Sequence, residues 1–149
     1  MKLLLILVTL QISFCTSAQN LVGVWQEGTP EVSSGYHNVY QFNIDGTFKF
    51  KTDEYFGLKR IISINGKYKR IKNALALTIL STTEVVGGSL ERSTTSGEAS
   101  DSWEIVGGEV KTLALPKMVS VNVIVESKKS DSDDAELILL DKRKYYKIK

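Results

Sequence analysis

Cysteine is almost absent from this chain. The one cysteine, Cys15, lies near the N-terminus, so the sequence after it can form no disulfide, thiolate metal site or cysteine nucleophile. Histidine is equally scarce, because His37 stands alone, and a metal site with two histidines is therefore excluded. We expect stability to come from the packing of apolar side chains.

The chain also lacks a long apolar run and an excess of charge. The longest apolar run extends from Leu3 to Leu10 and continues weakly to Phe14, whereas a membrane-spanning helix needs roughly 20 such residues. The formal net charge is only +2, and the basic residues are dispersed. Nothing in this balance predicts binding to nucleic acid or to an anionic membrane.

The first residues have the layout of a secretory signal peptide. Lys2 precedes the apolar run, and the small residues Thr16-Ser17-Ala18 stand directly before Gln19. A positive end, a short apolar core and small residues before the cleavage point are typical of such segments. We therefore expect residues 1–18 to be removed and residues 19–149 to form an exported domain, in the periplasm or outside the cell.

Cys15 leaves an alternative open, in which cleavage occurs before it and lipid is attached to the cysteine, as in bacterial lipoproteins. The residue before it is bulky Phe14, where such processing usually needs a small residue. The sequence therefore favours release over a lipid anchor.

An alternation of polar and apolar residues predicts antiparallel strands joined by tight turns. Each glycine-containing dipeptide between two alternating stretches is suited to the positive φ angles of a hairpin turn. Three such hairpins are predicted, with turns at Asp45-Gly46, Asn65-Gly66 and Gly107-Gly108.

Further strands are predicted over residues 75–79, 119–125, 137–140 and 146–148, with a turn at residues 141–144. Residues 119–125 place four valines on one face of their strand. No window has the periodicity and caps of an amphipathic helix, although a short helical turn near residues 53–56 stays open. Roughly eight to ten strands indicate one all-β domain, either a small barrel or a β-sandwich.

Two polar segments interrupt the alternation without marking a domain boundary. Residues 82–102 are rich in Gly, Ser and Thr and predict either a long hairpin or a loop. Residues 127–134 form a polar loop tip, whose acidic cluster lacks the glycine and distal glutamate of a helix-flanked calcium loop. We expect no metal at this cluster, which consists of Asp131, Asp133, Asp134 and Glu136.

Several short motifs follow one another in a characteristic order. They are Leu21-Val22-Gly23-Val24-Trp25 near the start, Tyr40-x-Phe42-Asn43-x-Asp45-Gly46-Thr47-Phe48, Gly66-x-Tyr68, Leu75-x-Leu77 and a closing hairpin over residues 137–146. This order resembles the lipocalin-like, calycin-type proteins exported by bacteria of the Bacteroidetes kind. The resemblance implies an antiparallel up-and-down β-barrel with an interior large enough for a ligand.

A broad indole on the first strand can close one end of such a barrel. We therefore assign Trp25 and Gly23 to the barrel base, with Gly23 permitting a close approach. An ordinary core position for Trp25 in any β fold is the alternative. The resemblance also raises the question of an arginine packed over Trp25, for which Arg143 is the nearest candidate by position.

The alternation places a set of aromatic side chains inside the barrel. Such side chains either fill a small barrel or line a pocket for one small ligand, and both interpretations stay open. In the second case the tyrosine hydroxyls would supply polar contacts. The inward set is Tyr40, Phe42, Phe48, Phe50, Tyr68 and Trp103, of which we take Tyr40, Phe42, Phe48, Tyr68 and Trp103 as candidate ligand contacts.

The sequence contains no arrangement that predicts catalysis. His37 falls on the polar phase of its strand, no Gly-x-Ser-x-Gly elbow is present, and neither Ser89 nor Ser96 has a predicted base beside it. We expect no catalytic residue, no cofactor and no metal. The leading interpretation is an exported domain that binds or carries a small hydrophobic molecule. An accessory or interaction domain without such a ligand, acting through residues 82–102, is the alternative.

Overall fold

The computed structural model describes residues 21–30, 37–54, 57–93, 103–129 and 135–148, and no helix occurs in these ranges. The strands are β1 (Gly23–Glu27), β2 (Val39–Phe42), β3 (Thr47–Lys51), β4 (Ile61–Ile71), β5 (Ala74–Val86), β6 (Ser89–Arg92), β7 (Trp103–Val106), β8 (Glu109–Lys129), β9 (Glu136–Leu140) and β10 (Arg143–Lys147).

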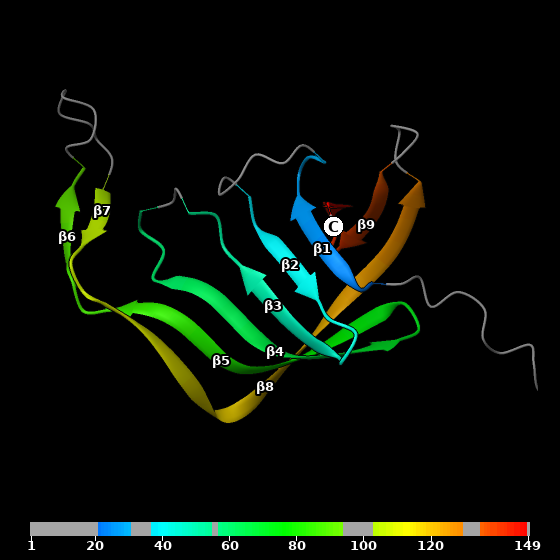
Figure 1. Ribbon diagram of the computed structural model, residues 1–149, viewed down its shortest axis with the longest axis horizontal. Coiled ribbons are helices and arrows are strands. Elements are labelled where there is room, and N and C mark those ends of the chain that lie inside the picture. Colours follow the sequence, from blue (N-terminus) through cyan, green and yellow to red (C-terminus); the bar gives the residue numbers. More distant parts are fainter. Residues whose placement is uncertain (1–20, 31–36, 55–56, 94–102, 130–134, 149) are drawn as a thin grey trace, which may run out of the picture.

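Eight of these strands close into a barrel in the order β1-β10-β9-β8-β5-β4-β3-β2, and every neighbouring pair in it runs antiparallel. Strands β6 and β7 form a separate two-stranded sheet, which lies at the far left of Figure 1, away from the barrel. The prediction of an all-β, up-and-down barrel is confirmed, and the sandwich alternative is set aside.

The turn predicted at Asp45-Gly46 is confirmed, whereas the turn predicted over residues 141–144 is shorter, because Arg143 and Lys144 already belong to β10. Gly46 has a φ of 80° in the β2–β3 turn, where the backbone N–H and the hydroxyl of Thr47 donate to Asp45 Oδ1 at 2.9 and 2.6 Å. These bonds, the hydroxyl bond first, lower the pKa of the Asp45 carboxyl. The β9–β10 turn places Asp141 and Lys142 at φ values of 48° and 70°, as a two-residue hairpin turn requires.

The prediction of a hairpin turn at Asn65-Gly66 is wrong, because both residues lie inside β4, where the register with β5 shifts. The turn occurs instead after β4, where Lys72 has a φ of 54°. Gly66 is needed for space: a Cβ there would lie 2.1 Å from the Thr78 carbonyl oxygen and 2.7 Å from Phe48 Cε1. The dipeptide Asn-Gly is typical of a turn, but here it lies inside a strand, where the glycine permits a close approach.

The predicted hairpin turn at Gly107-Gly108 is also wrong. This dipeptide faces Gly87-Gly88, and all four glycines have φ values between 74° and 89°. The β5–β8 ladder ends there and the β6–β7 ladder begins, so the paired glycines bend one long two-stranded ribbon. Arg60 holds the bend by donating to the carbonyl oxygen of Gly87 at 2.6 Å.

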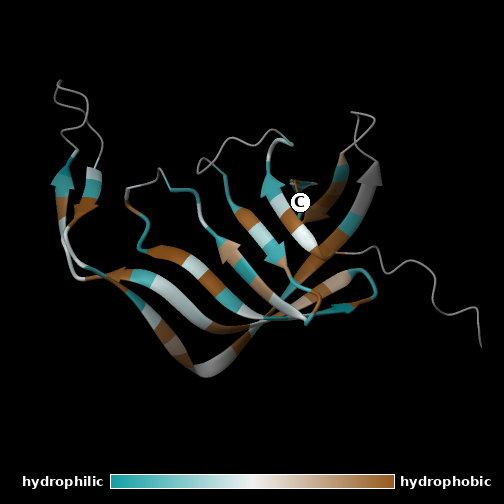
Figure 2. Ribbon diagram, viewed as in Figure 1, coloured by the Kyte–Doolittle hydropathy of each residue, from teal (hydrophilic) through white to brown (hydrophobic). Residues whose placement is uncertain are grey.

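The core fills the barrel with apolar side chains from all around the wall, and Figure 2 shows the apolar residues as brown bands along the strands. The largest fully buried side chains are Trp25, Phe42, Leu75 and Ile138.

The four valines of β8 do not share one environment. Val123 and Val125 are buried, whereas Val119 and Val121 are 46% and 41% exposed. Val119 and Val121 lie on a part of β8 that pairs with β5 but precedes the pairing with β9, which begins at Val125.

Trp25 occupies the core as predicted, and its indole Nε1 donates to the carbonyl oxygen of Leu21 at 2.7 Å. The cation above its ring is Lys147, whose Nζ lies 5.6 Å from the ring centroid, and not Arg143. Lys147 is placed there because it is the register partner of Trp25 in the β1–β10 ladder. Gly23, at the start of β1, has a φ of 140°, a conformation that side chains rarely permit.

Gly66→Ala is expected to lower the free energy of unfolding by about 1–3 kcal/mol, because the added Cβ collides with backbone that cannot move cheaply. Chemical denaturation measures the change. Gly107→Asn is the matched control, since nothing lies within 4 Å of a Cβ at this position and asparagine tolerates positive φ. Equal losses for the two variants would contradict the close-approach explanation.

Candidate ligand pocket

Six aromatic rings pack against one another inside the barrel. Tyr40 lies at the centre: its ring centroid is 4.6 Å from that of Phe50, 5.4 Å from that of Phe42 and 5.4 Å from that of Tyr145. Phe42 in turn contacts Phe48 and Tyr68, with centroids 6.5 and 5.0 Å apart. Edge-to-face and offset contacts of this kind stabilise each ring's position beyond the effect of burial. This part of the interior is therefore filled.

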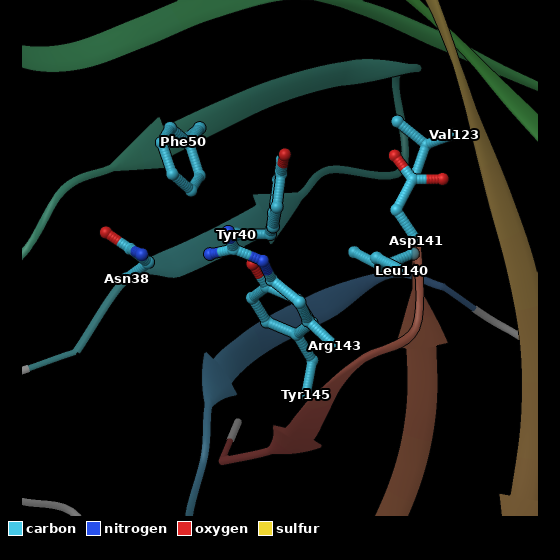
Figure 3. Close-up of a pocket in the computed structure, with 8 residues that line it drawn as sticks. All are labelled: Asn38, Tyr40, Phe50, Val123, Leu140, Asp141, Arg143 and Tyr145. Atoms are coloured by element: carbon cyan, nitrogen blue, oxygen red, sulfur yellow. The ribbon is translucent and has the colours of Figure 1, made fainter.

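A pocket of about 440 Å³ opens at one end of this aromatic cluster. Its wall combines side chains from the start of β2, from β3, β8 and β9, and from the β9–β10 turn and β10. The lining residues, drawn in Figure 3, are Asn38, Tyr40, Phe50, Val123, Leu140, Asp141, Arg143 and Tyr145. Aromatic side chains thus fill one part of the interior, and a pocket opens at another, so both interpretations of the inward set apply.

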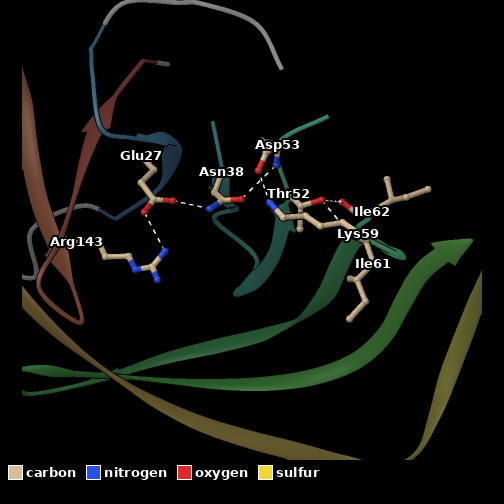
Figure 4. A network of polar contacts seen from close by, with 8 residues as sticks. All are labelled: Glu27, Asn38, Thr52, Asp53, Lys59, Ile61, Ile62 and Arg143. Carbon is tan, nitrogen blue, oxygen red and sulfur yellow. Dashed lines mark hydrogen bonds and ion pairs between the residues drawn. The ribbon is translucent and has the colours of Figure 1, made fainter. Parts of the chain in front are cut away.

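Glu27 organises the polar edge of the pocket. Its Oε1 accepts a hydrogen bond from Arg143 at 3.1 Å, and its Oε2 accepts one from Asn38 Nδ2 at 2.5 Å. The oxygen of the Asn38 side chain accepts from the backbone N–H of Asp53 at 3.2 Å, and Asp53 is paired with Lys59. Figure 4 shows this chain of contacts running along the edge. Two lining side chains are therefore held in place by one carboxylate.

Asp141 is in a different electrostatic situation. Its Oδ1 accepts a hydrogen bond from the backbone N–H of Ile124 at 2.9 Å. Within the part of the chain that the structure describes, the Asp141 carboxylate has no ionic partner. It thus lies exposed at the rim of the pocket as a negative charge without an ion pair among the described residues, whereas Arg143 is paired with Glu27.

Two tyrosine hydroxyls in the wall lack a protein partner. Tyr145 is only 4% exposed, yet neither its hydroxyl nor that of Tyr40 has a hydrogen-bond partner among the described residues. Tyr68, by contrast, donates to the carbonyl oxygen of Asn43 at 2.8 Å. A phenol hydroxyl at a largely buried position normally finds a partner, so these two hydroxyls are available to a molecule in the pocket.

Burial is the main cause that raises the pKa of both pocket tyrosines, since it disfavours the phenolate. For Tyr40 the next causes are the negative charges of Asp141 and then Glu27, and the positive charge of Arg143 acts in the opposite direction. Both hydroxyls therefore stay protonated at neutral pH and can donate hydrogen bonds.

The structure brings only part of the predicted contact set to the pocket. Tyr40 lines it, Phe42 and Phe48 are buried in the core, and Tyr68 packs against that core. The prediction that Trp103 faces the interior is wrong: it lies in β7, outside the barrel, and is 44% exposed. The residues around Trp103 do alternate between polar and apolar, but they belong to the separate β6–β7 sheet. There Arg92 lies over the ring of Trp103.

Sequence reasoning missed most of the remaining wall. In β10, Arg143 and Tyr145 alternate with Lys144, and this alternation was a signal in the sequence that Arg143 and Tyr145 share the inward face. In the structure, Tyr145 is the register partner of Ile138. Asp141 carried no signal except its place in a turn. The missed lining residues are Asn38, Val123, Leu140, Asp141, Arg143 and Tyr145.

Other sequence candidates lie away from the pocket or outside the described residues. His37 is partly buried and is not a lining residue. The hydroxyl of Ser89 donates to Glu91 at 2.6 Å, and Glu136 pairs with Lys147 at 2.9 Å. Residues 1–18, which were predicted to be a signal peptide, lie outside the described ranges, as do Ser96 and the three aspartates of the acidic cluster. Part of the possible helical turn at residues 53–56 also lies outside them.

Among the side chains that the structure describes, no three His, Cys, Asp or Glu residues lie close enough together to hold a metal ion. In the same ranges, no helix has the length and apolar character needed to cross a membrane.

Comparison with known proteins gives no match to a family model, to a curated protein or to a solved structure. The closed antiparallel barrel of eight strands is compatible with a lipocalin-like fold.

The raised pKa of Tyr145 has a measurable consequence at alkaline pH. The unfolded chain releases this phenol proton near the ordinary value of 10.0, whereas the folded protein retains it. The free energy of unfolding is therefore expected to fall as the pH rises above that value, and to fall less steeply in Tyr145→Phe. Denaturant titrations at a series of pH values measure both slopes, and identical slopes would contradict a buried, neutral Tyr145.

Proposed function

We propose that this protein is an exported binding domain that holds or carries a small, mainly apolar molecule in the pocket lined by Tyr40, Phe50 and Tyr145. The observation that carries the proposal is the open space itself, about 440 Å³ beside the cluster of packed aromatic rings. Ligand pockets of proteins are typically about 300–1,000 Å³ and combine an apolar wall with a few polar groups.

The composition of the wall supports this function. Val123 and Leu140 are buried aliphatic residues, and the rings of Tyr40 and Phe50 add flat apolar surface. Removing apolar ligand surface from water contributes about 25 cal/mol per Å². The wall thus supplies binding energy without any covalent step, and we propose a carrier or sequestering role rather than catalysis.

The wall is also largely organised before a ligand arrives. Tyr40 is held by four ring contacts, to Phe42, Phe48, Phe50 and Tyr145. Glu27 holds Arg143 by one hydrogen bond. Because these side chains lose little further freedom on binding, less of the interaction energy is spent on ordering them.

Val123→Phe is expected to abolish binding by placing a ring in the pocket. The probe is N-phenyl-1-naphthylamine, an uncharged fluorophore that brightens in apolar surroundings. Fluorescence titration should give a dissociation constant at least about tenfold higher than that of the unaltered protein, which corresponds to about 1.4 kcal/mol.

Ile124→Phe is the matched control, because Ile124 is the next residue of the same strand and is 58% exposed. It should leave the titration unchanged. Saturable binding that survives Val123→Phe would place the ligand elsewhere, and an absence of binding to the unaltered protein would refute the proposed function.

Export is tested on the protein recovered from the host cell. Mass spectrometry is expected to find a mature N-terminus at Gln19, since Thr16-Ser17-Ala18 supplies the small residues before the cleavage point. A diacylated Cys15 would show instead that the protein is lipid-anchored, and retention of residues 1–18 would refute the export proposal.

A further inference from the structure

Some charged groups in and beside the pocket have an ionic partner among the described residues, and one does not. This difference indicates the charge that the ligand should carry. At its edge, the positive charge of Arg143 is paired with Glu27, and the negative charge of Asp53 is paired with Lys59. Asp141 is the lining charge that lacks an ionic partner within the described ranges. The uncompensated charge that faces a ligand is therefore negative.

The second observation is the nearly buried side chain of Tyr145. At 4% exposure its hydroxyl opens on the pocket with no protein partner in the described part of the chain, and the hydroxyl of Tyr40 is in the same state. In the view of Figure 3 the Tyr40 hydroxyl lies between Phe50 and Asp141. A phenol oxygen can both donate and accept, so these hydroxyls suit a ligand group with N–H donors.

The aromatic rings favour the same sign of charge. The face of a phenol or phenyl ring carries partial negative charge and attracts a cation within about 6 Å of its centroid. The Tyr40 and Phe50 rings line the space beside Asp141. Burial is the main cause that raises the pKa of Tyr40, and the negative charge of Asp141 adds to it.

We propose, on the basis of the function given above, that the ligand is an amphiphilic amine: an apolar, preferably aromatic body that carries one protonated amino group. The ammonium pairs with Asp141 and hydrogen-bonds to the free tyrosine hydroxyls, and the apolar body lies against Phe50, Val123 and Leu140. An anionic group at the same place would face the carboxylate of Asp141, while the lining cation Arg143 is paired with Glu27.

Three probes of similar size and different charge test the ligand class. They are 2-phenylethylamine, 2-phenylethanol and 3-phenylpropanoate, each titrated into the full-length mature protein by isothermal calorimetry at neutral pH. The amine is expected to bind about tenfold more tightly than the alcohol, as a charge-assisted hydrogen bond in a partly buried site would give. The carboxylate is expected to bind most weakly.

Asp141→Asn isolates the charge. Asparagine retains an oxygen that can accept from the Ile124 N–H and tolerates the φ of 48° in this turn, so the fold should persist, which thermal denaturation checks. The amine should lose its tenfold advantage in this variant, while the affinity for the alcohol stays within about twofold. Glu109→Gln is the matched control, because it removes one carboxylate charge at an exposed position of β8 that does not line the pocket and should leave amine binding unchanged.

The possible outcomes separate the two proposals. Equal affinities for all three probes would overturn the amine assignment but leave an apolar pocket in place. Tightest binding of the carboxylate, lost in Arg143→Gln, would overturn it in favour of an anion site. If none of the three probes binds while N-phenyl-1-naphthylamine does, the amine assignment alone fails. If no probe binds at all, the proposed function fails with it.

Discussion

The contacts of Tyr40 with four other rings are the interaction on which the packing of the barrel interior depends. Phe42 lies on the same strand, Phe48 and Phe50 come from β3, and Tyr145 comes from β10. Tyr40 is also the register partner of Trp25 in β1. The Tyr40 ring thus packs side chains near the start of the chain against the last strand of the barrel, and it also lines the pocket.

The same arrangement explains why the interior is filled at one end and open at the other. In the filled part of the interior, Lys147 lies over the buried ring of Trp25, and the ring of Phe42 meets Phe48 and Tyr68. Toward the opposite end, the corresponding inward positions of β1 and β10 are held by the charged residues Glu27 and Arg143. Charged side chains keep their ionised groups near water, so they border an opening where aromatic residues would close it.

The fold could be predicted from the sequence because alternation with a period of two is a local property, and it is preserved along nearly every strand. The turn at Asp45-Gly46 was predictable for the same reason. The turns predicted at Asn65-Gly66 and Gly107-Gly108 were wrong because glycine serves three purposes in this chain. It forms a turn, permits a close approach at Gly66, or bends a ribbon. Which purpose applies depends on the partner strand, and a single sequence does not reveal that partner. The pocket was only partly predictable: Tyr40 follows from alternation, whereas Asp141 enters the wall through the closure of the barrel.

The paired glycines that bend the ribbon separate two parts of the molecule mechanically. Before the bend, β5 and β8 belong to the barrel wall, and beyond it β6 and β7 pair with each other. The register of the wall is fixed by the ladders on the barrel side, from Ala74 to Val86. The ribbon tip is nevertheless fastened to the connection between β3 and β4, because the Ile105 N–H donates to the carbonyl oxygen of Gly57 at 3.0 Å. A displacement of the tip is therefore transmitted to that connection as well as to the bend.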